Sequence, residues 1–197
     1  MKVAIVKYNA GNVQSVVFAV RRLGLEPLWT DDPEELNGAD RVIFPGQGEA
    51  SSAMEYLRAR GLDDALRQLE QPVLGICLGL QLMCSSSEEN DTECLGILPN
   101  RVLRFDDTLK VPHVGWNAIQ DLRGDLFRDI TNGEYAYFAH SYYVESDSNA
   151  TAISHYSTSF AAAVAVDNFQ AVQFHPEKSG TVGETILKNF LLPSGSR

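Results

Sequence analysis

The first half of the chain alternates short, continuously apolar runs with longer amphipathic ones. The apolar runs predict buried strands at 2–7, 26–30, 41–44 and 72–76. Between them, apolar residues at helical spacing predict helices at 12–23, 33–36, 50–59 and 62–70. Strand–helix alternation is typical of an α/β fold, here a doubly wound and mostly parallel central sheet with helices on both faces. Ligands of such sheets bind beyond the carboxyl ends of the strands.

The second half of the chain carries shorter β-rich runs that are separated by turn residues. These runs lie at 101–105, 116–120, 135–144, 151–156, 160–166 and 170–175. They predict an added antiparallel or mixed β layer. A helix is expected at 182–191, and the final PSGSR, residues 193–197, is expected to be a frayed tail. A chain of 197 residues suits one domain, expected over 1–192.

The composition excludes some classes of ligand and indicates the compartment of the protein. The formal net charge of −10 argues against nucleic acid and acidic membrane surfaces, since both favour clustered Lys and Arg. No apolar run approaches the roughly 20 residues of a membrane span, and the N-terminal run is too short for a signal peptide. Three cysteines without CxxC spacing suit a reducing compartment, so a cytoplasmic protein is expected. The four histidines form no ligand-spaced cluster, which predicts no metal site.

The stretch GICLG, residues 75–79, follows a predicted strand and precedes a helix-compatible run. Such a turn is typical of a nucleophile elbow, in which a strained residue presents its side chain and small neighbours make room for the crossing chain. Gly75 and Gly79 would make that room for Cys77. A helix N-terminus also favours the thiolate of the nucleophile. The alternative for this motif alone is a buried structural cysteine.

A second motif, AVQFHPEKS, lies about a hundred residues beyond Cys77. Ala171 to His175 are expected to form a strand, and residues i and i+2 of extended chain project to the same side, so His175 and Glu177 would face one site. A carboxylate beside an imidazole fixes its tautomer and stabilises the imidazolium, as in a nucleophile–base–carboxylate triad. An ion pair that caps a strand is the alternative for this motif alone.

Together, GICLGLQL and AVQFHPEKS resemble the class I glutamine amidotransferases, whose glutaminase domain has an α/β doubly wound fold and a Cys-His-Glu triad. The resemblance covers essentially the whole chain. The segments YNAGNVQSV, PGQG, PHVGWN and YFAHSY are more specifically similar to glutaminase subunits of imidazole glycerol phosphate synthases, in histidine biosynthesis. The triad motifs alone would also fit relatives that serve other biosynthetic pathways.

The resemblance implies a role for each matching residue, and no cofactor. Cys77 would be the nucleophile, His175 the general base and acid, and Glu177 the residue that orients His175. Backbone N–H groups of Leu78 and of the turn Gly46, Gln47 and Gly48 would bind the oxyanion, and the substrate contacts would be Gln81, Glu89, Ser141 and Tyr142. From the residues alone, Gln81 could be an ordinary helix-face residue and Glu89 part of a solvated loop.

The chain departs from the family pattern at two positions. Relatives usually have an apolar residue at the position of Gln47 and an acidic residue near Lys7. The first departure leaves open the mobility and the resting conformation of the oxyanion turn. Because glycine tolerates positive φ, the turn could place a peptide N–H toward or away from the oxyanion, so that a partner could switch activity on.

Ammonia freed into neutral water becomes non-nucleophilic ammonium, so a useful glutaminase needs a partner that receives it. The resemblance implies a heterodimer with a (β/α)8-barrel cyclase that makes imidazole glycerol phosphate and aminoimidazole carboxamide ribotide. Candidate interface residues are Trp116, Tyr137 and Lys178, although a Trp in a strand pattern is more often core. Two alternatives stay open: a diverged cyclase-like partner that aminates a sugar precursor, and a catalytically inactive regulatory subunit.

Overall fold

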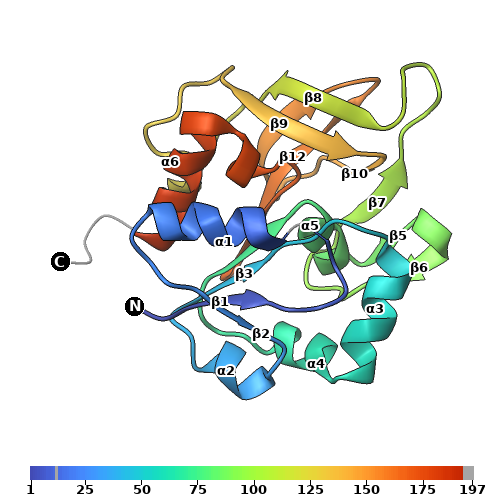
Figure 1. Ribbon diagram of the computed structural model, residues 1–197. Coiled ribbons are helices and arrows are strands. Elements are labelled where there is room, and N and C mark those ends of the chain that lie inside the picture. The colour runs from blue at the N-terminus through green and yellow to red at the C-terminus, as the bar shows by residue number, and fades with distance from the viewer. Residues whose placement is uncertain (12, 193–197) are drawn as a thin grey trace.

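A parallel sheet forms the centre of the molecule (Figure 1). The computed structural model describes residues 1–11 and 13–192, so the tail expected at 193–197 lies outside the described residues. Five parallel strands run in the order β2-β1-β3-β4-β13, with bounds Leu28–Thr30, Val3–Val6, Arg41–Phe44, Val73–Ile76 and Phe169–Val172. The four strands of the first half lie where the apolar runs predict them.

Helices cover both faces of this sheet, as expected (Figure 1). One face packs against α1 (Val13–Arg22) and α6 (Gly180–Leu191). The other face packs against α2 (Pro33–Asn37), α3 (Ala50–Ala59), α4 (Leu62–Arg67) and α5 (Leu78–Met83). Successive side chains of a strand point to opposite faces, and β1 accordingly sends Val3 and Ile5 into one core and Ala4 and Val6 into the other. This double burial explains why the strands are continuously apolar.

The second half extends the sheet with antiparallel and mixed pairs, which confirms the added β layer. From β13 the order continues through β12, β10, β7, β5 and β6, with bounds Ser159–Val166, Tyr142–Val144, Arg101–Arg104, Ser86–Ser87 and Thr92–Glu93. Strand β11 (Ala150–His155) pairs with β12. Strands β8 (His113–Ala118) and β9 (Tyr135–His140) form a separate antiparallel sheet of two strands.

The structure corrects two of the predicted strands. The run 135–144 is not one strand: it divides at Ser141, where the chain passes from β9 in the small sheet to β10 in the large one. The strand predicted at 170–175 ends at Val172, because the chain turns there toward the 3₁₀ helix η3 (Pro176–Lys178). Two further 3₁₀ helices, η1 (Glu89–Asp91) and η2 (Asp125–Phe127), and the short strands β5 and β6 lie in segments that showed no periodicity.

The carboxyl ends of β3 and β4 lead directly into the two turns that the sequence singles out. Strand β3 runs into the turn at 45–48, and β4 runs into Cys77. Strand β13 lies beside β4 and brings the segment of His175 to the same edge. Within residues 1–11 and 13–192, no helix is long and apolar enough to span a membrane.

Candidate active site

Cys77 occupies a strained turn between β4 and α5. Its φ of 54° and ψ of −106° lie in a region that side chains other than glycine rarely adopt, and such outliers gather at functional sites. Its N–H donates to the Val172 carbonyl at 2.8 Å, which ties the turn to β13. A Cβ atom on Gly79 would lie 1.8 Å from the Phe44 carbonyl oxygen, and one on Gly75 would lie 2.9 Å from Met83 Sδ. The expected role of both glycines is therefore confirmed.

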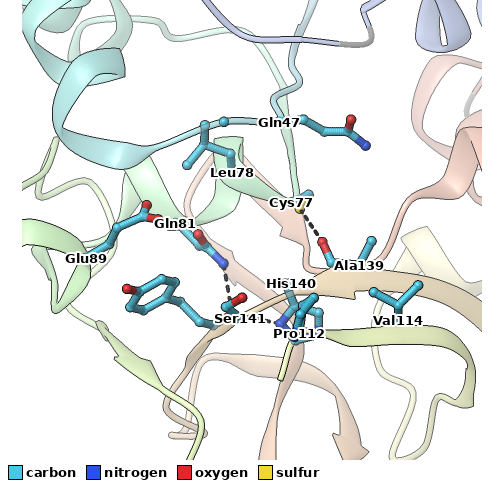
Figure 2. A pocket seen from close by; sticks show the side chains of 12 residues that line it. Gln47, Cys77, Leu78, Gln81, Glu89, Pro112, Val114, Ala139, His140 and Ser141 are labelled. Carbon is cyan, nitrogen blue, oxygen red and sulfur yellow. Dashed lines mark hydrogen bonds between the residues drawn. The ribbon is translucent and has the colours of Figure 1, made fainter. Parts of the chain in front are cut away.

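The sulfur of Cys77 lies at the wall of a pocket and is held by weak contacts. The residue is 6% exposed. Its thiol donates to the Ala139 carbonyl at 3.9 Å (Figure 2). Gln173 Nε2 donates to the sulfur at 3.7 Å. Both contacts are long and therefore weak.

His175 and Glu177 form a buried pair on η3 and the residue before it. The His175 Nδ1 to Glu177 Oε1 distance is 2.8 Å, and each side chain is 2% exposed. The sequence predicted that His175 and Glu177 face one site as residues i and i+2 of extended chain. The structure differs, because β13 ends at Val172 and Glu177 lies in a 3₁₀ turn. The backbone is fixed on both sides: His175 N–H donates to Tyr137 O at 2.8 Å, and Ser179 Oγ donates to His175 O at 2.6 Å.

The charge state of His175 follows from its surroundings. Burial acts to lower its pKa, but the negative charge and hydrogen bonding of Cys77 and Glu177 outweigh burial and raise the pKa to about 10. Because a proton on Nδ1 bonds to Glu177, the buried Nε2 nitrogen, which has no other hydrogen-bond partner, is the atom left to exchange a proton with Cys77. A protonated imidazole next to a cysteine sulfur is a surrounding that favours a reactive thiolate.

A pocket of about 330 Å³ opens in front of Cys77 (Figure 2). This volume is at the small end of the usual range for ligand sites. The four residues expected to contact the substrate all line it, together with parts of the oxyanion turn: Gln47, Gly48, Cys77, Leu78, Gln81, Glu89, Ser141 and Tyr142. His175 and Glu177 do not line this pocket; they line a smaller cavity that also includes Gly46 and Gln47.

Gln81 and Glu89 are neither a surface helix residue nor part of a solvated loop. Gln81 is 5% exposed, and its Nε2 donates to the Tyr142 carbonyl at 2.9 Å and to Gln173 Oε1 at 3.1 Å. Glu89 is half-buried, and one of its oxygens accepts from the Ala50 N–H at 2.8 Å. Burial raises the pKa of Glu89, partly offset by that hydrogen bond. Both plain alternatives that the sequence left open are therefore wrong.

The turn at 45–48 closes the expected oxyanion position instead of opening it. The Leu78 N–H donates to the Gly46 carbonyl at 3.3 Å, so one of the two candidate donors is occupied. The Gln47 carbonyl in turn accepts from the Gly11 N–H at 2.8 Å. Gly48 has a φ of 143°, which a residue with a side chain would rarely adopt. An anion in the pocket could use the Leu78 N–H only after the Gly46 carbonyl turned away.

Tyr8 supports this turn, a role that no motif in the sequence predicts. Its hydroxyl donates to the Pro45 carbonyl at 2.7 Å, and burial, together with the charge of Cys77, raises its pKa. A Cβ atom on Gly46 would lie 1.9 Å from the Tyr8 hydroxyl oxygen, so glycine is required at that position. The signal available in the sequence was the place of Tyr8 two residues after β1, at the edge of the sheet where the ligand site was expected.

The three candidate interface residues form one surface cluster beside the site. Trp116 is 55% exposed, which excludes the core alternative. Its ring and that of Tyr137 meet edge to face with centroids 6.1 Å apart, and Lys178 Nζ lies 5.9 Å from the centre of the Tyr137 ring. Val114, which lines the pocket, is 57% exposed on the same strand as Trp116. The cluster and the mouth of the pocket therefore share strand β8.

In the part of the chain that the structure describes, no three His, Cys, Asp or Glu side chains gather as ligands of a metal ion would.

Comparisons with known proteins agree with these features. Residues 4–193 match the family described as glutamine amidotransferase class-I. The chain is 54% identical over 194 residues to the imidazole glycerol phosphate synthase subunit HisH of Bacteroides fragilis, covering 97% of this chain and 99% of that protein. It is 47% identical over 192 residues to the subunit of the same name from Idiomarina loihiensis, covering 97% of each.

Solved structures support the fold. A structure described as a glutamine amidotransferase superposes with a TM-score of 0.76 at 20% identity and covers 97% of each chain. A structure of PurLQS from Thermotoga maritima superposes with a TM-score of 0.70 at 19% identity, covering 96% of this chain and 97% of that one. Since the family match spans nearly every residue and includes both the elbow of Cys77 and the His175–Glu177 pair, the chain belongs to the class I glutamine amidotransferase family.

Proposed function

We propose that this chain hydrolyses L-glutamine to glutamate and ammonia as the glutaminase subunit of an imidazole glycerol phosphate synthase, in histidine biosynthesis. The names and full-length identity of the curated relatives support the pathway. The observation that carries the chemistry is the position of Cys77, with a strained elbow beneath it, the buried His175–Glu177 pair behind it and a pocket in front of it.

The reaction follows from the charge state of this pair. The Cys77 sulfur attacks the side-chain carbonyl carbon of glutamine, and the carbonyl electrons move onto oxygen. His175 gives its Nε2 proton to the departing nitrogen, so that ammonia leaves and a γ-glutamyl thioester remains. Neutral His175 then takes a proton from water, which attacks the thioester and releases glutamate. Glu177 holds the imidazole in one orientation and stabilises its charged form, through the 2.8 Å bond to Nδ1.

The rest of the pocket recognises the backbone end of glutamine. Glu89 offers a carboxylate to the substrate ammonium group, since its other oxygen is already held by the Ala50 N–H. Ser141 and Tyr142, which also line the pocket, bind the carboxylate end. Gln81 acts mainly by fixing the Tyr142 carbonyl, because its amide nitrogen is committed to that carbonyl and to Gln173.

The partner is a (β/α)8-barrel cyclase bound as a heterodimer over strand β8. Trp116, Val114 and Tyr135 are large exposed apolar side chains on the two-stranded sheet, and Trp is enriched at binding hot spots. A partner seated there would cover the mouth of the pocket, since Val114 belongs both to this surface and to the pocket wall. Ammonia could then pass to the partner without protonation by bulk water.

The closed oxyanion turn is the resting state of the subunit. Rotation of the Gly46–Gln47 peptide would remove the carbonyl from the Leu78 N–H and bring the Gln47 N–H toward the pocket, giving two donors to the oxyanion. Binding of the cyclase and its substrate favours the rotated state. Glutamine is therefore hydrolysed when the ammonia can be used.

The proposal is tested by mixing the chain with the histidine-pathway cyclase and following imidazole glycerol phosphate. Glutamine should support product formation as well as a high concentration of ammonium salt does. A complex that uses ammonium but never glutamine would contradict the glutaminase role, and failure to bind this cyclase while binding a diverged cyclase-like protein would contradict the pathway.

A further inference from the structure

Two buried histidines lie opposite each other next to the substrate pocket, and the reaction above does not use them. His113 on β8 and His140 on β9 are cross-strand partners, 4% and 6% exposed, with His113 Nδ1 3.0 Å from His140 Nε2. Aromatic rings surround them: His113 stacks between Tyr156 and Phe138 at centroid distances of 4.1 and 5.2 Å. A polar pair in such apolar surroundings costs free energy unless its hydrogen bonds are all made.

The hydrogen bonds fix which nitrogen of each ring carries the proton. His140 Nδ1 lies 2.7 Å from the Tyr142 carbonyl, which can only accept, so Nδ1 carries the hydrogen. Burial lowers the pKa of His140 to about 3 and that of His113 to about 4, so both rings are neutral near pH 7. His140 Nε2 is then an acceptor, and His113 Nδ1 must donate to it. His113 Nε2 in turn accepts from Asn117 Nδ2 at 3.4 Å.

This chain of bonds ends at the segment where the substrate pocket is built. The Tyr142 carbonyl accepts from His140 Nδ1 at 2.7 Å and from Gln81 Nε2 at 2.9 Å. Ser141 lies between His140 and Tyr142, where the chain passes from the small sheet to the large one. Its carbonyl accepts a hydrogen bond from the Phe105 N–H. Figure 2 shows Ser141 between Gln81 and His140 on one wall of the pocket. The conformation of this wall therefore depends on the tautomer of His140.

We propose that His113 and His140 are positioning residues for glutamine, in which His113 holds His140 in the Nδ1–H tautomer and His140 holds the Ser141–Tyr142 segment in its binding conformation. The inference rests on the proposed glutaminase function. With the other tautomer, a bare Nδ1 nitrogen would face the Tyr142 carbonyl, and the two lone pairs would repel each other. The segment would shift, and glutamine would bind more weakly while Cys77 kept its reactivity.

The test uses four variants in the complex with the cyclase. His113→Phe keeps an aromatic ring in the stack but removes the donor, whereas His113→Asn keeps a donor near the position of Nδ1. His140→Leu and His140→Asn form the matched pair for the second ring. Each donor-free variant should raise the KM for glutamine about tenfold to a hundredfold, since a buried group then lacks its partner, with a smaller change in kcat. Each Asn variant should stay within about threefold of wild type, because the buried acceptor then keeps a donor.

Alkylation of Cys77 by iodoacetamide separates positioning from damage to the nucleophile, because this small reagent needs no contact with the 141–142 segment. Its rate should be the same in all four variants. Imidazole nitrogen NMR spectra of the wild-type complex provide a measurement that needs no variant, and should show both rings neutral with the proton on Nδ1.

Several results would overturn the inference. These are an unchanged KM in His113→Phe, a failure of both Asn variants to restore the KM, slower alkylation in parallel with the loss of activity, or an Nε2–H tautomer of His140. A wild-type complex that does not hydrolyse glutamine would instead overturn the proposed function, and this inference with it. The two failures are therefore distinguishable.

Discussion

Binding of the cyclase should raise the glutaminase rate of this chain by turning the Gly46–Gln47 peptide. In the structure, the Gly46 carbonyl accepts from the Leu78 N–H at 3.3 Å and so occupies a donor that the oxyanion needs. Loss of one such donor typically lowers kcat by about 10²–10³, equivalent to about 3–4 kcal/mol. To recover this factor, partner binding has to favour the turned peptide by about 3–4 kcal/mol, a coupling free energy at or slightly above the usual range of about 1–3 kcal/mol.

The assay measures glutamate formation by the chain alone, with the cyclase, and with the cyclase plus its nucleotide-like ligand. The rate should rise at each step, by about 10²–10³ in total. Alkylation of Cys77 should change little across the three conditions, because it develops no oxyanion. Equal glutaminase rates in all three would refute the reasoning.

A substitution in the turn at 45–48 tests whether this turn carries the stimulation by the cyclase. Gly48→Ala places a side chain at a φ of 143°, which typically costs about 1–3 kcal/mol of strain, and should change the ratio of stimulated to basal rate. Gly133→Ala is the matched control, since Gly133 also has a positive φ of 91° and no neighbour within 4 Å of an added Cβ. Stimulation that is undiminished in Gly48→Ala would place the switch elsewhere. Gly46 is unsuitable because its Cβ would collide with the Tyr8 hydroxyl.

Three further predictions concern the residues around the nucleophile. Glu177→Gln should lower the glutaminase activity of the complex less than Cys77→Ala does, because an orienting carboxylate is less indispensable than a nucleophile. Equal and complete loss of activity in a folded Glu177→Gln variant would contradict a purely orienting role. His175, whose pKa is raised to about 10, should stay protonated at pH 8 in NMR titrations, and its pKa should fall in Cys77→Ala, because a negative neighbour is lost; an unchanged pKa would contradict the ion pair. Tyr8→Phe should lower the free energy of unfolding by about 1–3 kcal/mol in denaturant titrations, since the Pro45 carbonyl loses a buried donor. An unchanged free energy of unfolding would contradict the proposed support of the turn by Tyr8.

Much of the fold could be predicted because its strands are buried on both sides. Strands β1, β3 and β4 are short apolar runs in the sequence, and the helices between them carry apolar stripes on one face. The break at Ser141 could not be predicted, because 135–144 reads YAYFAHSYYV, which is rich in strand-forming aromatic residues and holds no Gly or Pro that would indicate a turn. What divides it is a pair of hydrogen bonds to the Tyr142 carbonyl, one of them from Gln81, 61 residues away in the chain.

Motifs predict that His175 pairs with Glu177 and that the candidate substrate contacts gather around Cys77, as the structure has them, but motifs do not predict the surroundings of these residues. Glu89 lies in a polar run that gives no sign of its hydrogen bond to the N-terminus of α3, 39 residues earlier. The sequence leaves the state of the oxyanion turn open, because glycines permit both orientations of the peptide. His113 and His140 showed no metal-ligand spacing, and only the register of β8 and β9 reveals that they are partners.

The central claim is that Cys77 is the nucleophile that releases ammonia from glutamine. The most direct measurement compares glutamine-dependent and ammonium-dependent synthesis of imidazole glycerol phosphate by the complex of the cyclase with Cys77→Ala. Cys84→Ala serves as the control, since Cys84 is a buried cysteine in the hydrophobic core whose thiol donates to the Leu80 carbonyl. We predict that Cys77→Ala abolishes the glutamine-dependent reaction and leaves the ammonium-dependent one intact, while Cys84→Ala keeps both. Glutamine-dependent turnover that survives in Cys77→Ala would contradict the assignment.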